Sequence, residues 1–248
     1  MYRQLNQDLT ISTLQTLSNR IQERFPDSGL YRVSLELLNV AAETRGRIEW
    51  MSRAHVPIRL CISLILISAF ASCWMVVRHV RADDSEFQLE EFVPMLEAGL
   101  NALVLIGAAL FFLFTLESRI KQSRALRALH ELRAISHVID MHQLTKDPSQ
   151  LIAASGLRTP SSPSRTLTAF QLIRYLDYCS ELLSLIGKLG ALYAQSIPDA
   201  VVLNAVNDIE VLTNGLSRKI WQKIMILDDD LMREKSVSAE TSVTATAE

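Results

Sequence analysis

Two uncharged apolar runs constrain the fold of this 248-residue chain more than any other feature. The first, LCISLILISAFASCWMVV, occupies residues 60–77, and the second, AGLNALVLIGAALFFLFTL, occupies residues 98–116. A helix needs about 20 predominantly apolar residues to cross a hydrocarbon layer about 30 Å thick. Both runs come close to that length without a charge, so the sequence predicts two transmembrane helices.

The basic residues around the two runs predict the orientation of the chain. Eight of them lie outside the pair of runs: Arg45, Arg47, Arg53, Arg59, Arg119, Lys121, Arg124 and Arg127. The segment between the runs carries only two arginines together with six carboxylates. Because loops rich in Lys and Arg stay on the cytoplasmic side, we expect both termini in the cytoplasm. The predicted location is the cytoplasmic (inner) membrane, with the protein crossing it twice.

Outside the apolar runs, hydrophobic residues recur three and four positions apart, which is the period of amphipathic helices. The predicted fold is therefore all-α, a two-pass transmembrane helical hairpin with a long stalk helix and a cytoplasmic, coiled-coil-like helical bundle. The predicted divisions are a cytoplasmic helical hairpin (1–56), a first transmembrane helix (57–78), a short acidic external loop (79–93), a second transmembrane helix (94–117) that opens at Pro94, a cytoplasmic stalk helix (118–144), a flexible linker (145–165), a C-terminal helical hairpin (166–234) and a disordered tail (235–248).

The C-terminal hairpin carries the clearest periodicity. Its first helix has a heptad seam, formed by Leu172, Leu176, Cys179, Leu183, Ile186, Gly190, Tyr193 and Ile197. Such a seam is typical of a coiled coil or a helix bundle. The sequence leaves open whether it pairs within one chain or between chains, and Trp221 is expected to pack within the last helix.

Composition and motifs point away from several classes of function. A net charge of −2 and a pI near 6.2 do not favour a nucleic-acid partner. The three cysteines show no CxxC spacing, and neither a GxSxG motif nor a glycine-rich phosphate loop occurs. We therefore expect no cofactor and no catalytic residue.

A histidine-rich stretch in the stalk, HELRAISHVIDMH at residues 130–142, offers one candidate site. His137 and Asp140 stand one helical turn apart, the only pair there that would approach one ion together, while His130 is two turns from His137. A zinc site would need further ligands from another helix or subunit. A solvated polar face is the favoured interpretation, and a metal-binding or proton-sensing site is the alternative.

Weakly polar residues form stripes along both apolar runs. Ser68 and Ser72 share a face of the first, and Glu97, Asn101, Ala108 and Thr115 share a face of the second. Small and polar residues let helices approach closely in lipid, which favours a packing role within or between chains. The alternative is a pore lining in which the acidic mouth at Glu97 concentrates cations.

The sequence thus favours a self-associating, membrane-anchored helical scaffold or regulator without catalytic activity. Its expected partners are the lipid bilayer and either further copies of itself, in a homo-oligomer, or a cytoplasmic protein. Within the bundle, Leu172, Leu176, Leu183 and Ile186 are the residues expected to carry the seam. The first alternative is an oligomeric cation channel or its regulatory subunit, and the second is a membrane-bound metal-dependent enzyme.

Overall fold

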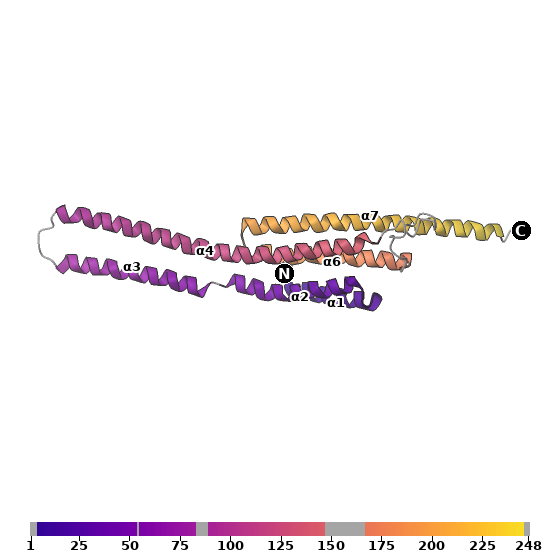
Figure 1. Ribbon diagram of the computed structural model, residues 1–248, viewed down its shortest axis with the longest axis horizontal. Coiled ribbons are helices and arrows are strands. Elements are labelled where there is room, and N and C mark those ends of the chain that lie inside the picture. Colours follow the sequence, from indigo (N-terminus) through magenta and orange to yellow (C-terminus); the bar gives the residue numbers. More distant parts are fainter. Residues whose placement is uncertain (1–3, 54, 83–88, 147–166, 246–248) are drawn as a thin grey trace. The chain divides into compact units, whose positions relative to one another are not determined.

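The computed structural model describes residues 4–53, 55–82, 89–146 and 167–245, and every regular element in these ranges is an α-helix (Figure 1). The side chains of 52, 79–82, 89–92, 230 and 233–245 are outside the description. The chain divides into two compact units, which we call the helical unit (Met1–Trp50 and Ala125–Glu248) and the span unit (Met51–Arg124). The all-α prediction is confirmed for the described residues.

The span unit is built from α3 (Val56–Ala82) and the first part of α4 (Leu89–Leu144). Both contain stretches long and apolar enough to cross a membrane, and no residue of the most apolar stretch of either is buried inside the protein. Large apolar side chains are exposed along these helices, with Phe70 71%, Met75 75% and Phe111 74% accessible. In water this much contiguous apolar surface would be unfavourable, so the surface is suited to an apolar surrounding.

Both long helices exceed the predicted spans. Helix α3 continues to Ala82, into the predicted 79–93 loop, and the residues between the helices, 83–88, are outside the described part of the chain. Helix α4 begins at Leu89, so Pro94 lies inside it and the prediction that Pro94 opens the helix is wrong. Pro94 is tolerated because it stands near the N-terminus, where the missing N–H removes a single intrahelical bond. From there α4 runs unbroken to Leu144, the residue at which the predicted stalk helix ends.

The N-terminal part of the helical unit is a pair of helices, α1 (Gln7–Arg24) and α2 (Gly29–Ser52). The Asn6 side chain caps α1 by accepting a hydrogen bond from the Leu9 N–H at 3.2 Å. Between the helices, Asp27 adopts a φ of 59°, a left-handed conformation that Asp tolerates better than most residues. Both helices lie within the range 1–56 over which the sequence predicts a cytoplasmic helical hairpin.

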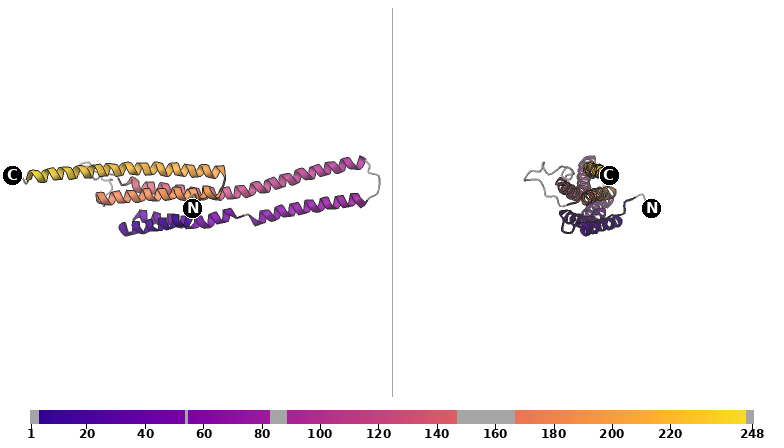
Figure 2. Two further views of the ribbon diagram at one scale, coloured as in Figure 1. Left: turned by 180° about the vertical axis from the view of Figure 1, so that it is seen from behind. Right: turned by 90° about the vertical axis from the view of Figure 1, so that its right-hand side faces the viewer.

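The C-terminal part is formed by α6 (Ala169–Ser196) and α7 (Ala200–Ala245), which lie side by side and antiparallel (Figures 1 and 2). A reciprocal capping box between Thr168 and Gln171 starts α6, and the Asp199 carboxylate accepts two backbone N–H bonds to start α7. These caps provide acceptors for backbone N–H groups in the first turns of α6 and α7, which have no partner within their own helices.

All eight residues of the predicted seam are buried within the helical unit. Gly190 shows what the seam contacts, because a Cβ atom there would meet Ile209 at 3.8 Å and Val206 at 3.9 Å on α7, and Leu129 at 4.0 Å on α4. Helix α6 also packs against α1, where the Phe25 ring lies edge-on to Tyr175 with 5.4 Å between centroids. The seam therefore packs against other helices of the same chain.

Two further expectations about the C-terminal end differ from the structure. Trp221 is 58% exposed and does not pack in the core, because it lies on the face of α7 away from the buried Val202, Ile209 and Ile220. Helix α7 also extends to Ala245, through the segment predicted as a disordered tail. Neither Gly nor Pro follows Gly215, and extending an existing helix avoids the cost of nucleation. Most of the predicted linker (145–165) lies outside the described residues, because these omit 147–166.

Candidate functional site

The predicted stripe on the second span lies on the surface of α4. Glu97, Asn101 and Ala108 are exposed and Thr115 is half-buried. The Thr115 hydroxyl donates to the Phe111 carbonyl at 2.8 Å, so its own helix already satisfies it. Ser68 and Ser72 are likewise exposed on α3. The stripes thus present weakly polar groups at the surface of the span unit.

His137 and Asp140, the candidate pair, differ in their surroundings. His137 is exposed, whereas Asp140 is half-buried and accepts a hydrogen bond of 2.6 Å from the Gln143 side-chain amide. In the described part of the chain, no three His, Cys, Asp or Glu residues gather in a group able to hold a metal ion. Asp140 serves to orient Gln143, whose side chain is almost completely buried.

A different histidine of the same stretch has a defined environment that the sequence pattern did not reveal. The ring of His142 covers the first residue of α2 so closely that a Cβ atom on Gly29 would overlap its Cε1. Burial lowers the pKa of His142, and the nearby cations Arg32 and Lys146 lower it further. The neutral imidazole is therefore the form that this contact favours.

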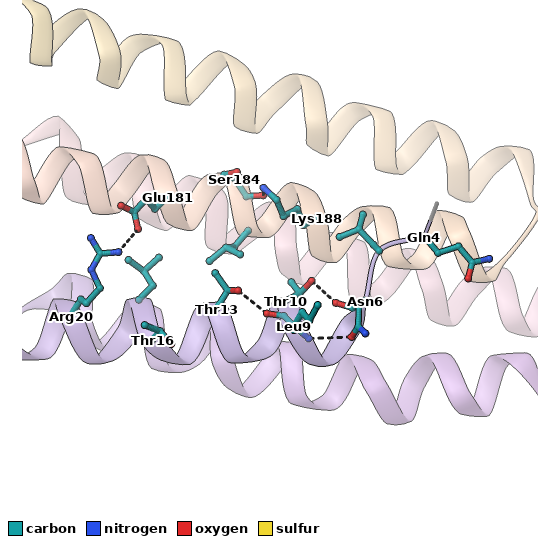
Figure 3. Close-up of a pocket in the computed structure, with 13 residues that line it drawn as sticks. Gln4, Asn6, Leu9, Thr10, Thr13, Thr16, Arg20, Glu181, Ser184 and Lys188 are labelled. Atoms are coloured by element: carbon teal, nitrogen blue, oxygen red, sulfur yellow. Dashed lines mark hydrogen bonds and ion pairs between the residues drawn. The ribbon is translucent and has the colours of Figure 1, made fainter. Parts of the chain in front are cut away.

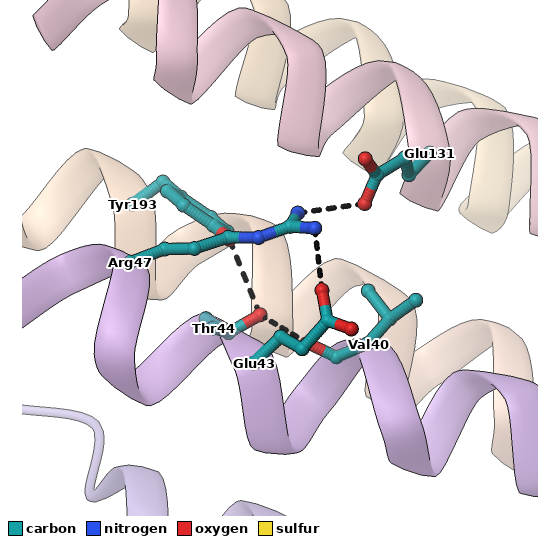
Figure 4. Close-up of polar contacts among 6 residues, drawn as sticks. All are labelled: Val40, Glu43, Thr44, Arg47, Glu131 and Tyr193. Carbon is teal, nitrogen blue, oxygen red and sulfur yellow. Dashed lines mark hydrogen bonds and ion pairs between the residues drawn. The ribbon is translucent and has the colours of Figure 1, made fainter.

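A network of polar side chains joins α2, α4 and α6 inside the helical unit (Figure 4). The Arg47 guanidinium donates to Glu131 on α4 and to Glu43 on its own helix, both at 2.6 Å. The hydrogen bond to Glu131 is the main reason that the pKa of Arg47 is raised. The arginine is thereby held charged and oriented between two carboxylates.

The buried end of this network is a pair of hydroxyl groups. Tyr193 of α6 is completely buried, and its hydroxyl donates to the Thr44 hydroxyl of α2 at 3.2 Å. Thr44 in turn donates to the Val40 carbonyl at 2.7 Å. Burial raises the pKa of Tyr193, so the phenol stays protonated and acts as a donor. Because polar groups in a core must be paired, this contact fixes the register between α2 and α6.

An open groove of about 950 Å³ runs between α1 and α6 (Figure 3). Several of its polar groups are already bonded: the Thr13 hydroxyl donates to the Leu9 carbonyl at 2.7 Å, and the Lys188 ammonium donates to the Ser184 hydroxyl at 2.6 Å. An ion pair between Arg20 and Glu181, 3.3 Å long, lies along it. What the groove offers is chiefly shape and apolar contact, with Leu9 65% exposed.

Comparison with protein-family models, with curated proteins and with solved structures finds no match to this chain. The function therefore has to be argued from the two units themselves. The span unit offers exposed apolar helices with polar stripes. The helical unit offers a packed core with a buried polar network and an open groove, an arrangement suited to binding and positioning.

Proposed function

We propose that this chain is an integral membrane protein in which the span unit anchors a cytoplasmic helical unit, and that it works as a self-associating scaffold or regulator without catalytic activity. The observation that carries the proposal is that no residue of the most apolar stretches of α3 and α4 is buried inside the protein. A helix in the core of a soluble domain buries such a stretch, whereas a helix in lipid leaves it on the surface.

The charge distribution supports the orientation with both termini in the cytoplasm. Arg53 precedes α3 and Arg59 lies in its first turn, and Arg119, Lys121 and Arg124 follow the second apolar stretch on α4. The connection between the helices is rich in carboxylates instead. By the positive-inside rule the helical unit then faces the cytoplasm of the inner membrane.

The packing of the helical unit favours the role of a scaffold over that of a passive tail. Its four helices α1, α2, α6 and α7 pack with the second part of α4 around a continuous apolar core. The Arg47 and Tyr193 contacts specify one arrangement of these helices. A rigid unit with an open groove presents a defined surface to a further copy or to a cytoplasmic protein partner.

Membrane integration is tested by alkaline extraction of membranes from cells that express the full chain. We expect the protein to stay in the membrane pellet and to leave it only with detergent. As a matched pair, Leu105→Arg places a charge in the second apolar stretch, and Val211→Arg places one on the exposed surface of α7. Leu105→Arg should raise the extracted fraction, because a central arginine costs about 2.5–3.5 kcal/mol of insertion free energy, and Val211→Arg should not.

Release of the wild-type protein by alkali would refute the membrane anchor. The scaffold role is separated from a cation pore by ion flux into liposomes that contain the purified chain. We expect flux equal to that of protein-free liposomes. If ions did enter these liposomes and Glu97→Gln abolished the flux, the proposal of a scaffold would be replaced by that of a channel.

A further inference from the structure

The amide of Asn101 is the most polar uncharged group in the second apolar stretch, and it has no hydrogen-bond partner within the described part of the chain. The residue is four positions inside the run 98–116 and its side chain is exposed on α4. Among the described residues no hydrogen bond to this amide is formed. In water such an amide is solvated, but in hydrocarbon it has no partner, and an unpaired polar group there is strongly unfavourable.

The residues that share its face permit another helix to come close. Asn101, Ala108 and Thr115 are separated by steps of seven, so they follow one line along α4, with Val104 and Phe111 beside it. Ala108, in the middle of the line, leaves room for a neighbouring backbone, and small residues at this position favour close helix contact in lipid. Thr115 needs no partner because its hydroxyl is bonded to Phe111.

We propose that this face of α4 is the contact between two copies of the chain, with the two Asn101 amides hydrogen-bonded to each other across a two-fold axis. An amide carries both donors and an acceptor, so each of two identical amides can donate one hydrogen bond to the other and accept one from it. Two copies in one membrane have the same orientation, and a two-fold axis along the membrane normal brings each residue of the face opposite itself. This inference rests on the proposed membrane anchor and names the surface through which the scaffold self-associates.

Glu97 gives the contact a second property. It stands on the same face, just outside the apolar run, so the two-fold axis brings two carboxylates near each other at the membrane edge. Like charges in that position oppose association. Glu97→Gln is therefore expected to tighten the dimer, whereas in a cation pore the same change removes the acidic mouth.

The test measures association of the full chain in lipid vesicles by energy transfer between donor-labelled and acceptor-labelled copies, over a range of protein-to-lipid ratios. Asn101→Leu should weaken association about 3- to 30-fold, which corresponds to the measured strength of hydrogen bonds between membrane helices. Asn101→Gln keeps the amide and should retain association. Leu103→Ala, a change at a residue that is 67% exposed on the opposite face, should leave it unchanged.

Oxidative cross-linking supplies an independent readout. Ala108→Cys should form a covalent dimer, and Leu103→Cys should give no more than the parent chain with its native cysteines. A dimer that survives Asn101→Leu at full strength and fails to cross-link at Ala108 would overturn this interface while leaving the scaffold in place. A strictly monomeric chain would overturn both the interface and the self-associating scaffold. A closed ring of four or more copies would favour the cation pore over the dimer.

Discussion

The buried hydroxyl pair between α2 and α6 allows a quantitative test of the account of the helical unit. Tyr193 and Thr44 are both fully buried, and their contact joins residues 149 positions apart in the sequence. Tyr193→Phe removes the donor and leaves Thr44 bonded to Val40, so it should lower the free energy of unfolding by about 1 kcal/mol. Thr44→Val leaves the phenol as a buried donor without its acceptor, which should cost about 1–3 kcal/mol.

The double variant is the informative one. When both hydroxyls are replaced by apolar groups of similar shape, no polar group is left unpaired, so the cost should be smaller than the sum of the two single costs by about 1 kcal/mol or more. Urea unfolding of the full chain in detergent micelles, followed by circular dichroism, supplies the four free energies. Single costs that add within about 0.3 kcal/mol would show that the two hydroxyls do not interact and would refute the reasoning.

Three further predictions concern the same unit. Gly190→Ala adds a Cβ at ordinary contact distances and improves helix propensity, so it should raise the free energy of unfolding by about 0.5–1 kcal/mol in urea titrations, and a destabilised variant would contradict the described packing. The folded pKa of His142 is lower than the unfolded value, so its contribution to stability is fully present above about pH 6.5 and is lost as the pH falls below it. The melting temperature should therefore fall less between about pH 7 and pH 5 in His142→Gln than in the parent chain. The control variant His137→Gln, at an exposed position, should show the same fall as the parent chain. Leu183→Asp buries a charge in a fully buried position and should destabilise the helical unit by about 4 kcal/mol or more, while Val211→Asp, at a site 73% exposed, should leave its circular dichroism and melting temperature unchanged.

The sequence predicts the helices well because apolar spacing directly reports which face is buried. Leu176 and Leu183 were expected on a seam and both are completely buried. The periodicity could not show whether the seam packs against helices of the same chain or of a second copy. The contacts around Gly190 answer that question, since they involve α7 and α4 of the same chain and satisfy the seam without a second copy.

The polar network was not predicted, and the reason is physical. The contacts of Arg47 with Glu131 and of Tyr193 with Thr44 join residues on helices far apart in the sequence, which no local pattern reveals. Only the packing of α2 against α4 and α6 brings them together. The contact between His142 and Gly29 is of the same kind, although the glycine at the start of α2 is a signal that a close approach can occur there.

Residues at helix ends and on outer faces were also predicted less well than the core. Trp221 was expected to pack within the last helix, but its side chain is 58% exposed on α7. Pro94 was expected to start a helix, yet the helix extends past it toward the N-terminus. In both places single-residue preferences were outweighed by the helix to which the residue belongs.

The central claim, that the chain crosses the membrane twice with the helical unit in the cytoplasm, is tested most directly by cysteine labelling in intact cells. Ser85→Cys introduces a thiol in the connection between α3 and α4, and Asn204→Cys introduces one at an exposed position of α7. With a membrane-impermeant maleimide, added outside cells whose inner membrane is intact and accessible, we expect Ser85→Cys to be labelled and Asn204→Cys to be labelled only after that membrane is opened. Equal labelling of both positions in intact cells, or labelling of Asn204→Cys alone, would contradict the account.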